Sequence, residues 1–307
     1  MGFSAADAPV VVVSLDQTFA RHAAVTLMSV LSHTPEVRLF ALVPEDFGQQ
    51  QALQDAVGPA LTIVPASMTA FDTLQLWSGA SPAVYLRLLL GDVLPVRRAI
   101  FLDCDIVVRS SLMPLWNQAL GDAIIGAVPD PAFADHARLG LAPGATYFNA
   151  GVMLIDLEQW RAVEIGARSI AWAQANPHRM TFSDQCVLNW LLQDQWMAID
   201  QTWNHQAGHC GRRTRGGFVF DRAATGDPAI VHYNAPPDYG RRGDCEGKPW
   251  MYLCQHPWTF EYRRIAAHTP WAGLVAADSY PHNRVLRTLR SNADWATPAY
   301  RALRRVI

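Results

Sequence analysis

The chain has 307 residues, of which 50% are hydrophobic and 17% charged, so it can bury a large core in one domain or in a domain with a smaller appendage. Its formal net charge of -2 provides no basic field of the kind that a general nucleic-acid-binding protein carries. Five cysteines without framework spacing indicate reduced thiols, and no apolar run is long enough to cross a bilayer. We therefore expect a cytoplasmic protein that binds no nucleic acid.

Predicted strands and helices alternate along most of the chain. Short continuous apolar runs predict strands covered on both faces at residues 10–15, 37–43, 61–64, 99–103, 124–128 and 148–155, with short later strands at 219–220 and 230–233. Apolar residues at helical spacing predict helices at 24–31, 46–57, 82–90, 157–174 and 184–193. The alternation predicts an α/β fold with a mostly parallel sheet flanked by helices, which binds its ligands beyond the carboxyl ends of the strands.

The end of the chain has a different composition. Past Pro281, arginines alternate with apolar residues and face a single acid, Asp294. This pattern is compatible with two structures. One is a basic amphipathic tail on the inner face of the cytoplasmic membrane, and the other is a terminal helix packed on the body with a solvated arginine face.

Two aspartates, Asp103 and Asp105, interrupt the apolar run FLDCDIVV at residues 101–108. Residues i and i+2 of a strand point to the same side, so both carboxylates are expected to face one way at the ligand edge of the sheet. Neither would be buried there unpaired. Hard oxygen ligands suit Mg²⁺ or Mn²⁺, whose coordination shells keep positions for substrate phosphates.

A histidine and the single lysine of the chain follow much later. His232 lies in the predicted strand 230–233, and Lys248 follows a loop rich in Pro, Gly and charge at 234–247. An imidazole beside two carboxylates favours Mn²⁺ over Mg²⁺, and an ammonium group is a compact charge suited to phosphate. A purely structural histidine is the alternative for His232.

Taken in order, these pieces resemble the family 8 glycosyltransferases, which include glycogenin and bacterial lipopolysaccharide galactosyl- and glucosyltransferases. Each matching piece is weak alone, but the ordered set is specific. The pieces are VSLD at 13–16, VTLMSV at 25–30, YLRL at 85–88, FLDCD at 101–105, YFNAGV at 147–152, DQ at 184–185 with LN at 188–189, HY at 232–233 and GKPW at 247–250.

The resemblance implies an A-type glycosyltransferase fold. The catalytic domain would span 1–260, with a donor-binding half at about 1–130 and an acceptor half at about 131–260, followed by a helical extension at 261–307. The implied activity is that of a hexosyltransferase (EC 2.4.1 type) that moves glucose or galactose from a UDP-sugar with retention at the anomeric carbon. The acceptor would be a glycan or lipid-linked glycan in the synthesis of lipopolysaccharide or another bacterial surface glycan. The cofactor would be Mn²⁺, with Mg²⁺ as the alternative.

The resemblance also implies roles for single residues. The metal ligands would be Asp103, Asp105 and His232. The residues in contact with the donor would be Asp16 at the uridine or ribose, Arg87, Lys248 at the diphosphate, and Asp103, Cys104 and Asp105 themselves. The residues that line the sugar pocket would be Arg87, Asn149, Asp184 and Gln185. The catalytic candidates would be Asn149, Asp184 and Gln185, joined by Asp130.

Retention leaves two mechanisms open. Two displacements through a covalent intermediate need a carboxylate beneath the sugar ring, for which Asp184 and Asp130 are the candidates. Attack on the same face within a short-lived ion pair needs no such nucleophile. We favour the second mechanism, because an amide such as that of Gln185 is a poor nucleophile.

The chain departs from the family pattern in two places. The family often has two adjacent polar residues and then an aromatic after the first strand. Here the polar pair is Asp16-Gln17 and the aromatic, Phe19, comes two positions further on, so the contacts to uridine are open. The segment 235–246 lengthens the usual loop between His232 and Lys248 by about ten residues, and ordered loops of this length are often functional. It would form a lid or an acceptor-facing loop, or it would displace Lys248 from the phosphates.

Two other functions fit the residues less well. A sugar-nucleotide nucleotidyltransferase would need a Gly-rich phosphate loop after the first strand, and residues 13–18 (VSLDQT) contain no glycine. A catalytically inactive sugar-nucleotide-binding protein conflicts with the intact metal and phosphate candidates. The spacing of His205, His209 and Cys210 is a weak zinc signal. Their loop is instead predicted to line the acceptor pocket, where Arg212, Arg213 and Arg215 would either meet an anionic acceptor or stay solvated.

Overall fold

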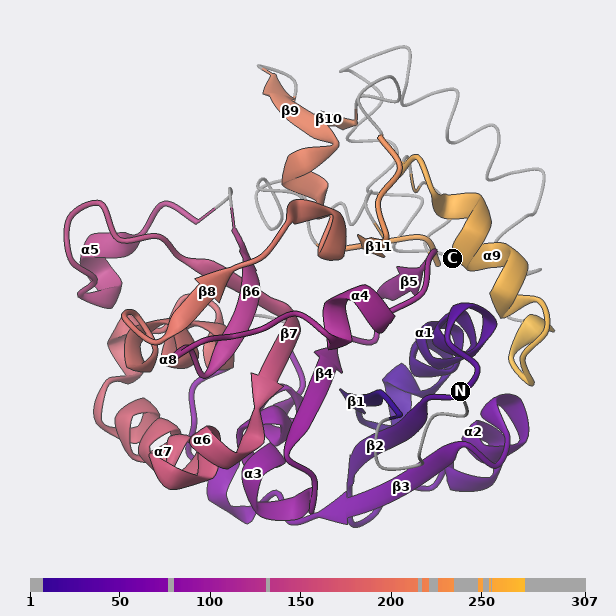
Figure 1. Cartoon of the computed structure of the whole chain (residues 1–307), viewed down its shortest axis with the longest axis horizontal. Coiled ribbons are helices and arrows are strands. Elements are labelled where there is room, and N and C mark those ends of the chain that lie inside the picture. Colours follow the sequence, from indigo (N-terminus) through magenta and orange to yellow (C-terminus); the bar gives the residue numbers. More distant parts are fainter. Residues whose placement is uncertain are drawn as a thin grey trace, which may run out of the picture. The chain divides into compact units, whose positions relative to one another are not determined.

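The computed structural model describes residues 8–76, 80–130, 133–214, 217–220, 226–234, 248–250, 254 and 256–273 (Figure 1). The chain divides into a large unit, Met1–Gln206 with Asp227–His232, and a small unit, Ala207–Gly226 with Tyr233–Ile307. The predicted loop at 235–246 and the arginine-rich tail past Pro281 lie outside the described residues, and the predicted domain limits stay a prediction. No helix of the described part of the chain is both long and apolar enough to cross a membrane.

A seven-stranded sheet forms the centre of the large unit, in the order β3-β2-β1-β4-β7-β6-β8. Its strands are β1 Val10–Ser14, β2 Arg38–Pro44, β3 Leu61–Ala66, β4 Arg98–Leu102, β6 Ile125–Pro129, β7 Phe148–Asp156 and β8 Trp196–Ala198. All neighbouring pairs are parallel except those of β7, which runs antiparallel to both β4 and β6. This sheet confirms the predicted α/β fold with a mostly parallel sheet.

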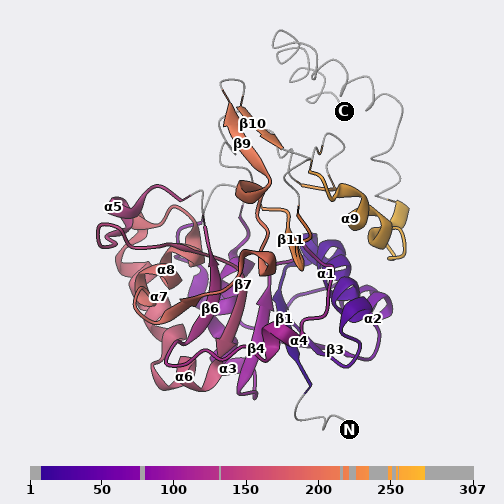
Figure 2. The same ribbon diagram turned by 45° about the horizontal axis from the view of Figure 1, so that its top comes forward.

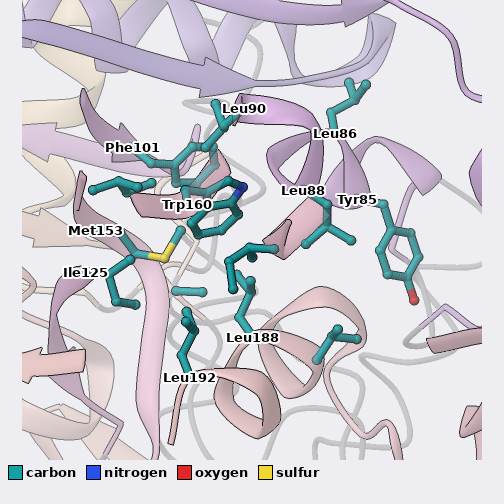
Figure 3. Close-up of a cluster of buried hydrophobic side chains, with 14 of the residues drawn as sticks. Tyr85, Leu86, Leu88, Leu90, Phe101, Ile125, Met153, Trp160, Leu188 and Leu192 are labelled. Carbon is teal, nitrogen blue, oxygen red and sulfur yellow. The ribbon is translucent and has the colours of Figure 1, made fainter. Parts of the chain in front are cut away.

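Both faces of the sheet are covered. On one face, apolar side chains of the strands pack against the segment that begins at Pro82 and against α6 and α8, with Phe101, Met153, Trp160 and Leu188 among them (Figure 3). Val11 and Val13 alternate along β1 with residues of this cluster and are also fully buried. Burial on two faces explains why these strands are continuous apolar runs in the sequence.

The helices follow the predicted order with some different limits. They are α1 Ala20–His33, α2 Gln50–Val57, α3 Leu90–Val93, α4 Met113–Trp116, α5 His136–Leu139, α6 Leu157–Ala162, α7 Ile165–Ala175, α8 Ser183–Leu191 and α9 Thr259–Ala266. The single helix predicted at 157–174 is two helices, because the chain turns at Glu164, whose φ of 52° is left-handed. The helix predicted from Pro82 is a 3-10 helix, η3 Pro82–Leu89, capped by the Ser81 side chain and continued by α3.

The run FLDCDIVV is two strands and a bend. β4 ends at Leu102, residues 103–105 form the bend, and β5 Ile106–Val108 leaves the central sheet. β5 pairs antiparallel with β11 Ile230–His232 in a separate two-stranded sheet, and the two strands lie side by side in Figure 1 and Figure 2. The Asp pair therefore lies in a bend between two strands, and the expectation that it lies in one strand is wrong.

The remaining short elements are η1 Gln17–Phe19, η2 Thr69–Phe71, η4 Pro177–Arg179, η5 Gln201–Trp203, η6 Ala207–His209 and the antiparallel strands β9 Gly211–Thr214 and β10 Gly217–Phe220. In the small unit, the buried hydroxyl of Tyr233 donates a 2.7 Å hydrogen bond to the carbonyl of Trp258, just before α9. The Tyr233 ring lies edge-on to those of His256 and Tyr262, which gives this unit an aromatic core of its own.

Candidate functional site

The bend at residues 103–105 is held by a buried polar side chain of α1. The Thr26 hydroxyl lies 2.9 Å from the carbonyl oxygen of Cys104 and 2.8 Å from that of Ile106. The thiol of Cys104 is directed at the Ser14 carbonyl of β1, 3.3 Å away, and burial raises its pKa well above the ordinary value. The Cys104 side chain is thus turned to the core, while the carboxylates on either side of it approach His232.

Asp103, Asp105 and His232 meet at this point. The His232 Nε2 atom lies 3.2 Å from Asp105 Oδ1 and 3.7 Å from Asp103 Oδ2. His232 is distant in sequence from the two aspartates, and its pairing with Ile106 in the β11–β5 ladder brings it to them. Within the described part of the chain, this is the one group of three or more His, Cys, Asp or Glu donors that all lie within 4.8 Å of one another. His205, His209 and Cys210, the weak zinc signal of the sequence, do not form such a group.

The three donors fit a divalent cation. Two carboxylate oxygens and an imidazole nitrogen form a borderline-hard set of the type that Mn²⁺ accepts. Gly151 of β7 leaves room for the group, because a Cβ atom there would lie 2.3 Å from His232 Cε1 and 2.8 Å from Asp103 Oδ2. The His232 side chain is 3% exposed and that of Asp103 is 26% exposed, so the donor set opens toward solvent on the side of Asp103.

Arg87 links this group to a second carboxylate. Its guanidinium is 2.7 Å from Asp103 Oδ1 and 2.8 Å from Asp184 Oδ2, and it donates to the Ala150 carbonyl at 2.8 Å. It also lies over the Phe101 ring, 4.4 Å from the centroid. Burial lowers the pKa of Arg87, but the charges of Asp103 and Asp184 outweigh burial and raise it. Arg87 thus occupies one oxygen of Asp103 and leaves the other toward His232.

Asp184 lies at the start of α8, almost fully buried. Burial raises its pKa to about 6, while Arg87 opposes the shift and Asp103 adds to it. The preceding residue, Ser183, has a left-handed φ of 43°, which is unusual for a residue with a side chain. Backbone strain of this kind persists where the surrounding structure over-determines it, and it clusters at functional sites.

Asn149, Gln185 and Asp130 form a hydrogen-bonded cluster near the same strand ends. Asp130 Oδ2 accepts hydrogen bonds from Asn149 Nδ2 at 3.2 Å and from Gln185 Nε2 at 3.3 Å. Gln185 Oε1 accepts from the backbone N–H of Ala150 at 3.0 Å. Because β7 is antiparallel, its first residues lie beside the carboxyl ends of β4 and β6, which brings Asn149 to the edge where Asp103 and Asp130 follow their strands.

Asp16 follows β1 and caps η1. Its Oδ1 atom accepts from the Thr18 backbone N–H at 2.9 Å and from the Phe19 N–H at 3.2 Å. Burial raises the pKa of Asp16, but hydrogen bonds from Ser81, Thr18 and Phe19 outweigh it and lower the pKa. Gln17 ties this turn to the loop after β2, through the Asp46 carbonyl at 2.7 Å. Oδ1 of Asp16 therefore caps the turn, and only its other oxygen, Oδ2, is left for the predicted contact with the donor.

Lys248 belongs to the small unit. Its ammonium nitrogen lies 5.4 Å from the centroid of the Trp250 ring. Its assignment to a diphosphate, like the ligand assignments of the other residues above, stays a prediction.

Sequence reasoning missed three residues of this site. Thr26 is a hydroxyl on the buried face of an amphipathic helix, and that position is a signal that could have found it. Thr26 and Gly151 each belong to a piece that matches the family, VTLMSV and YFNAGV, but the match assigns no role to either residue. Asn204, whose Oδ1 is 2.9 Å from His232 Nδ1, follows a 3-10 turn in a loop with no periodic pattern, and no signal marks it.

The comparison with protein families identifies the class of protein. The family model described as Glycosyl transferase family 8 matches residues 10–254. The chain belongs to this family, which confirms the resemblance found in the sequence, and it is a glycosyltransferase.

Individual relatives are distant. The chain is 26% identical over 276 residues to General stress protein A of Bacillus subtilis (strain 168), which covers 83% of this chain and 92% of that protein. It is 29% identical over 192 residues to the lipopolysaccharide glucosyltransferase WaaO of Escherichia coli (strain K12), covering 59% of this chain and 51% of that protein. Several relatives are longer, and the chain spans 55% of Glycosyltransferase GlyF of Streptococcus pneumoniae.

Among solved structures, the galactosyltransferase LgtC in complex with donor and acceptor sugar analogs is similar. The TM-score is 0.71 at 26% identity, and the match covers 86% of this chain and 99% of that one. The A-type glycosyltransferase fold predicted for the chain is confirmed by this similarity.

Proposed function

We propose that this chain is a retaining hexosyltransferase that moves glucose or galactose from a UDP-sugar to a glycan acceptor of lipopolysaccharide or another bacterial surface glycan. The observation that carries the proposal is the meeting of Asp103, Asp105 and His232 at the strand ends of a family 8 fold. Two similar proteins support the substrate class, since one is named a lipopolysaccharide glucosyltransferase and the other a galactosyltransferase. A nucleotidyltransferase is not favoured.

The metal in this proposal is Mn²⁺, with Mg²⁺ as the alternative, held by Asp103, Asp105 and His232. When bound, a divalent ion neutralises charge that develops on the diphosphate leaving group. Asp103 can share its carboxylate between this ion and Arg87, because the two oxygens face different partners. The ion pair with Arg87 thereby fixes the rotamer of a ligand that would otherwise be free on its exposed side.

The sugar would lie beside Asn149, Asp184 and Gln185, with Asp16 at the uridine or ribose and Lys248 at the diphosphate. For retention we propose attack on the same face of the sugar. Asp184 is buried against Arg87, and Asp130 accepts from two amides, so neither carboxylate is a free nucleophile. A glycosyl adduct trapped on Asp184 or Asp130 and located by mass spectrometry would contradict this mechanism.

The decisive experiment measures UDP release from a panel of UDP-sugars in Mn²⁺ or in EDTA. We expect release from UDP-glucose or UDP-galactose only with the metal, and a loss of about 100-fold or more in Asp105→Asn. Asp122→Asn, an exposed aspartate on the loop before β6, is the matched control and should release UDP like the wild type. Metal-independent release, or none from any UDP-sugar, would refute the proposal.

The position of Lys248 is tested separately. If its ammonium holds the diphosphate, Lys248→Ala should weaken UDP-sugar binding with little change in Mn²⁺ binding, because the metal ligands are all in the large unit. Unchanged donor affinity would mean that the long loop before Lys248 has removed it from the phosphates.

A further inference from the structure

Asn204 is fully buried in the large unit, directly after η5. The neighbouring residue His205 pairs with β11 through two backbone hydrogen bonds, to the Ile230 carbonyl at 3.0 Å and from the His232 N–H at 3.1 Å. This bridge sets Asn204 between His232 on one side and Asn149 on the other. Its Oδ1 and Nδ2 atoms both contact residues of the candidate site.

The orientation of Asn149 follows from groups that can play only one role. The backbone N–H of Gly151 can only donate, and it lies 3.0 Å from one terminal atom of Asn149, which must therefore be the oxygen. At the other terminal atom, 3.2 Å away, lies an oxygen of Asp130, and an ionised carboxylate can only accept. Both anchors give the same orientation, with Asn149 Oδ1 toward Gly151 and Nδ2 toward Asp130.

The orientation of Asn204 follows in turn. Asn149 Oδ1 also lies 3.0 Å from Asn204, and two amide oxygens would repel each other there, so the facing atom is Asn204 Nδ2. Asn204 Oδ1 is then the atom 2.9 Å from His232 Nδ1. A neutral imidazole beside this acceptor carries its one proton on Nδ1, and the lone pair remains on Nε2. Nε2 is the atom that faces Asp103 and Asp105.

We infer that Asn204 is a positioning residue that sets the Nδ1–H tautomer and the ring orientation of His232, so that Nε2 presents its lone pair to a divalent cation. The chain of hydrogen bonds that fixes this orientation starts at the Gly151 N–H and passes through Asn149 and Asn204 to the His232 ring. The inference rests on the proposed metal role of His232. Groups that orient a metal-binding imidazole in this way are typically worth about 10- to 100-fold in metal affinity.

The tautomer is measured without any metal. Long-range ¹H–¹⁵N NMR of the metal-free protein at about pH 8, where an ordinary imidazole is neutral, distinguishes Nδ1–H from Nε2–H, and His232→Gln assigns the signal. We expect a proton on Nδ1 of His232, with or without a second proton on Nε2, because Nε2 faces the carboxylates of Asp103 and Asp105 when no metal is bound. A ring protonated on Nε2 alone would overturn the inference, and this result needs no variant of Asn204 to fold.

The effect on metal binding is measured by titrating Mn²⁺ and following the free ion by electron paramagnetic resonance. Asn204→Ala should raise the Mn²⁺ dissociation constant about 10- to 100-fold. The matched control is Asn189→Ala, which removes an equally buried amide that hydrogen-bonds Phe148 and Gln185 backbone atoms and touches no metal ligand. Equal Mn²⁺ affinity in the two variants would overturn the role of Asn204, whereas a wild-type chain that binds no Mn²⁺ would overturn the proposed metal site itself.

Discussion

Gly151→Ala tests whether the spacing of the site is as tight as the structure has it. The added methyl group would lie 2.3 Å from His232 Cε1, 2.8 Å from Asp103 Oδ2 and 2.9 Å from His232 Nδ1. An ordinary contact begins at 3.4 Å, so the imidazole carbon would have to retreat by 1.1 Å along that line. Asp103 and His232 cannot both give way without changing the distance between them.

The size of that displacement decides the expected result. Metal sites tolerate ligand shifts of a few tenths of an ångström, and His232 is 2% exposed with its Nδ1 held by Asn204. We expect Gly151→Ala to weaken Mn²⁺ binding by at least about 10-fold, the lower end of what a disturbed ligand orientation costs. Overpacking of the buried strand should also lower the free energy of unfolding by about 1–3 kcal/mol.

Two measurements on one preparation separate these effects. Mn²⁺ affinity is measured by titration, and the free energy of unfolding by urea denaturation in EDTA. Gly126→Ala is the control, because its methyl group would lie 3.0 Å from Ile199 Cγ2 and 3.1 Å from Leu120 Cδ2, away from the metal ligands. The control should lose stability while keeping wild-type Mn²⁺ affinity. Wild-type affinity in Gly151→Ala would refute the reasoning.

Two further predictions concern stability. Asp184 has a pKa of about 6 in the folded protein against an ordinary value of 3.8, so between these pH values the folded state holds a proton that the unfolded chain has released. The contribution of Asp184 to the free energy of unfolding should fall by about 3 kcal/mol as pH rises through this window. This contribution is measured in EDTA as the free energy of unfolding of the wild type minus that of Asp184→Asn. A difference between the two proteins that does not change with pH would contradict the raised pKa of Asp184. Thr26→Val keeps the shape of the side chain but removes the hydroxyl at the Cys104 and Ile106 carbonyls, and it should cost about 1–2 kcal/mol in urea denaturation. Unchanged stability would mean that the hydroxyl does not hold the bend.

The strands of the sheet could be predicted where burial on both faces makes the sequence continuously apolar. The strands β1 and β4 are apolar runs because both faces are covered, and their positions agree with the prediction. The direction of β7 was not predictable, since an apolar run reads the same either way. The break between α6 and α7 at Glu164 could not be predicted, because neither glycine nor proline occupies the position whose backbone is left-handed.

The candidate site was predictable where its residues form part of a pattern. Asp103 and Asp105 attract attention because carboxylates are out of place in an apolar run, although a bend, not a shared strand, turns them to His232. No such sequence pattern identifies Asn204. Its significance comes from where the bridge between His205 and β11 puts it, which depends on the folded chain alone.

The pairing of β11 with β5 also bears on how the molecule folds. Ile230 pairs with Val108, so the third donor joins the first two only after a chain segment of more than a hundred residues has been closed into a loop. Closing such a loop is entropically costly and slow compared with forming the local helices and the parallel pairs of β1, β2 and β3. A chain in which β11 has not paired with β5 carries Asp103 and Asp105 without His232, so the proposed metal site is complete only in the folded chain.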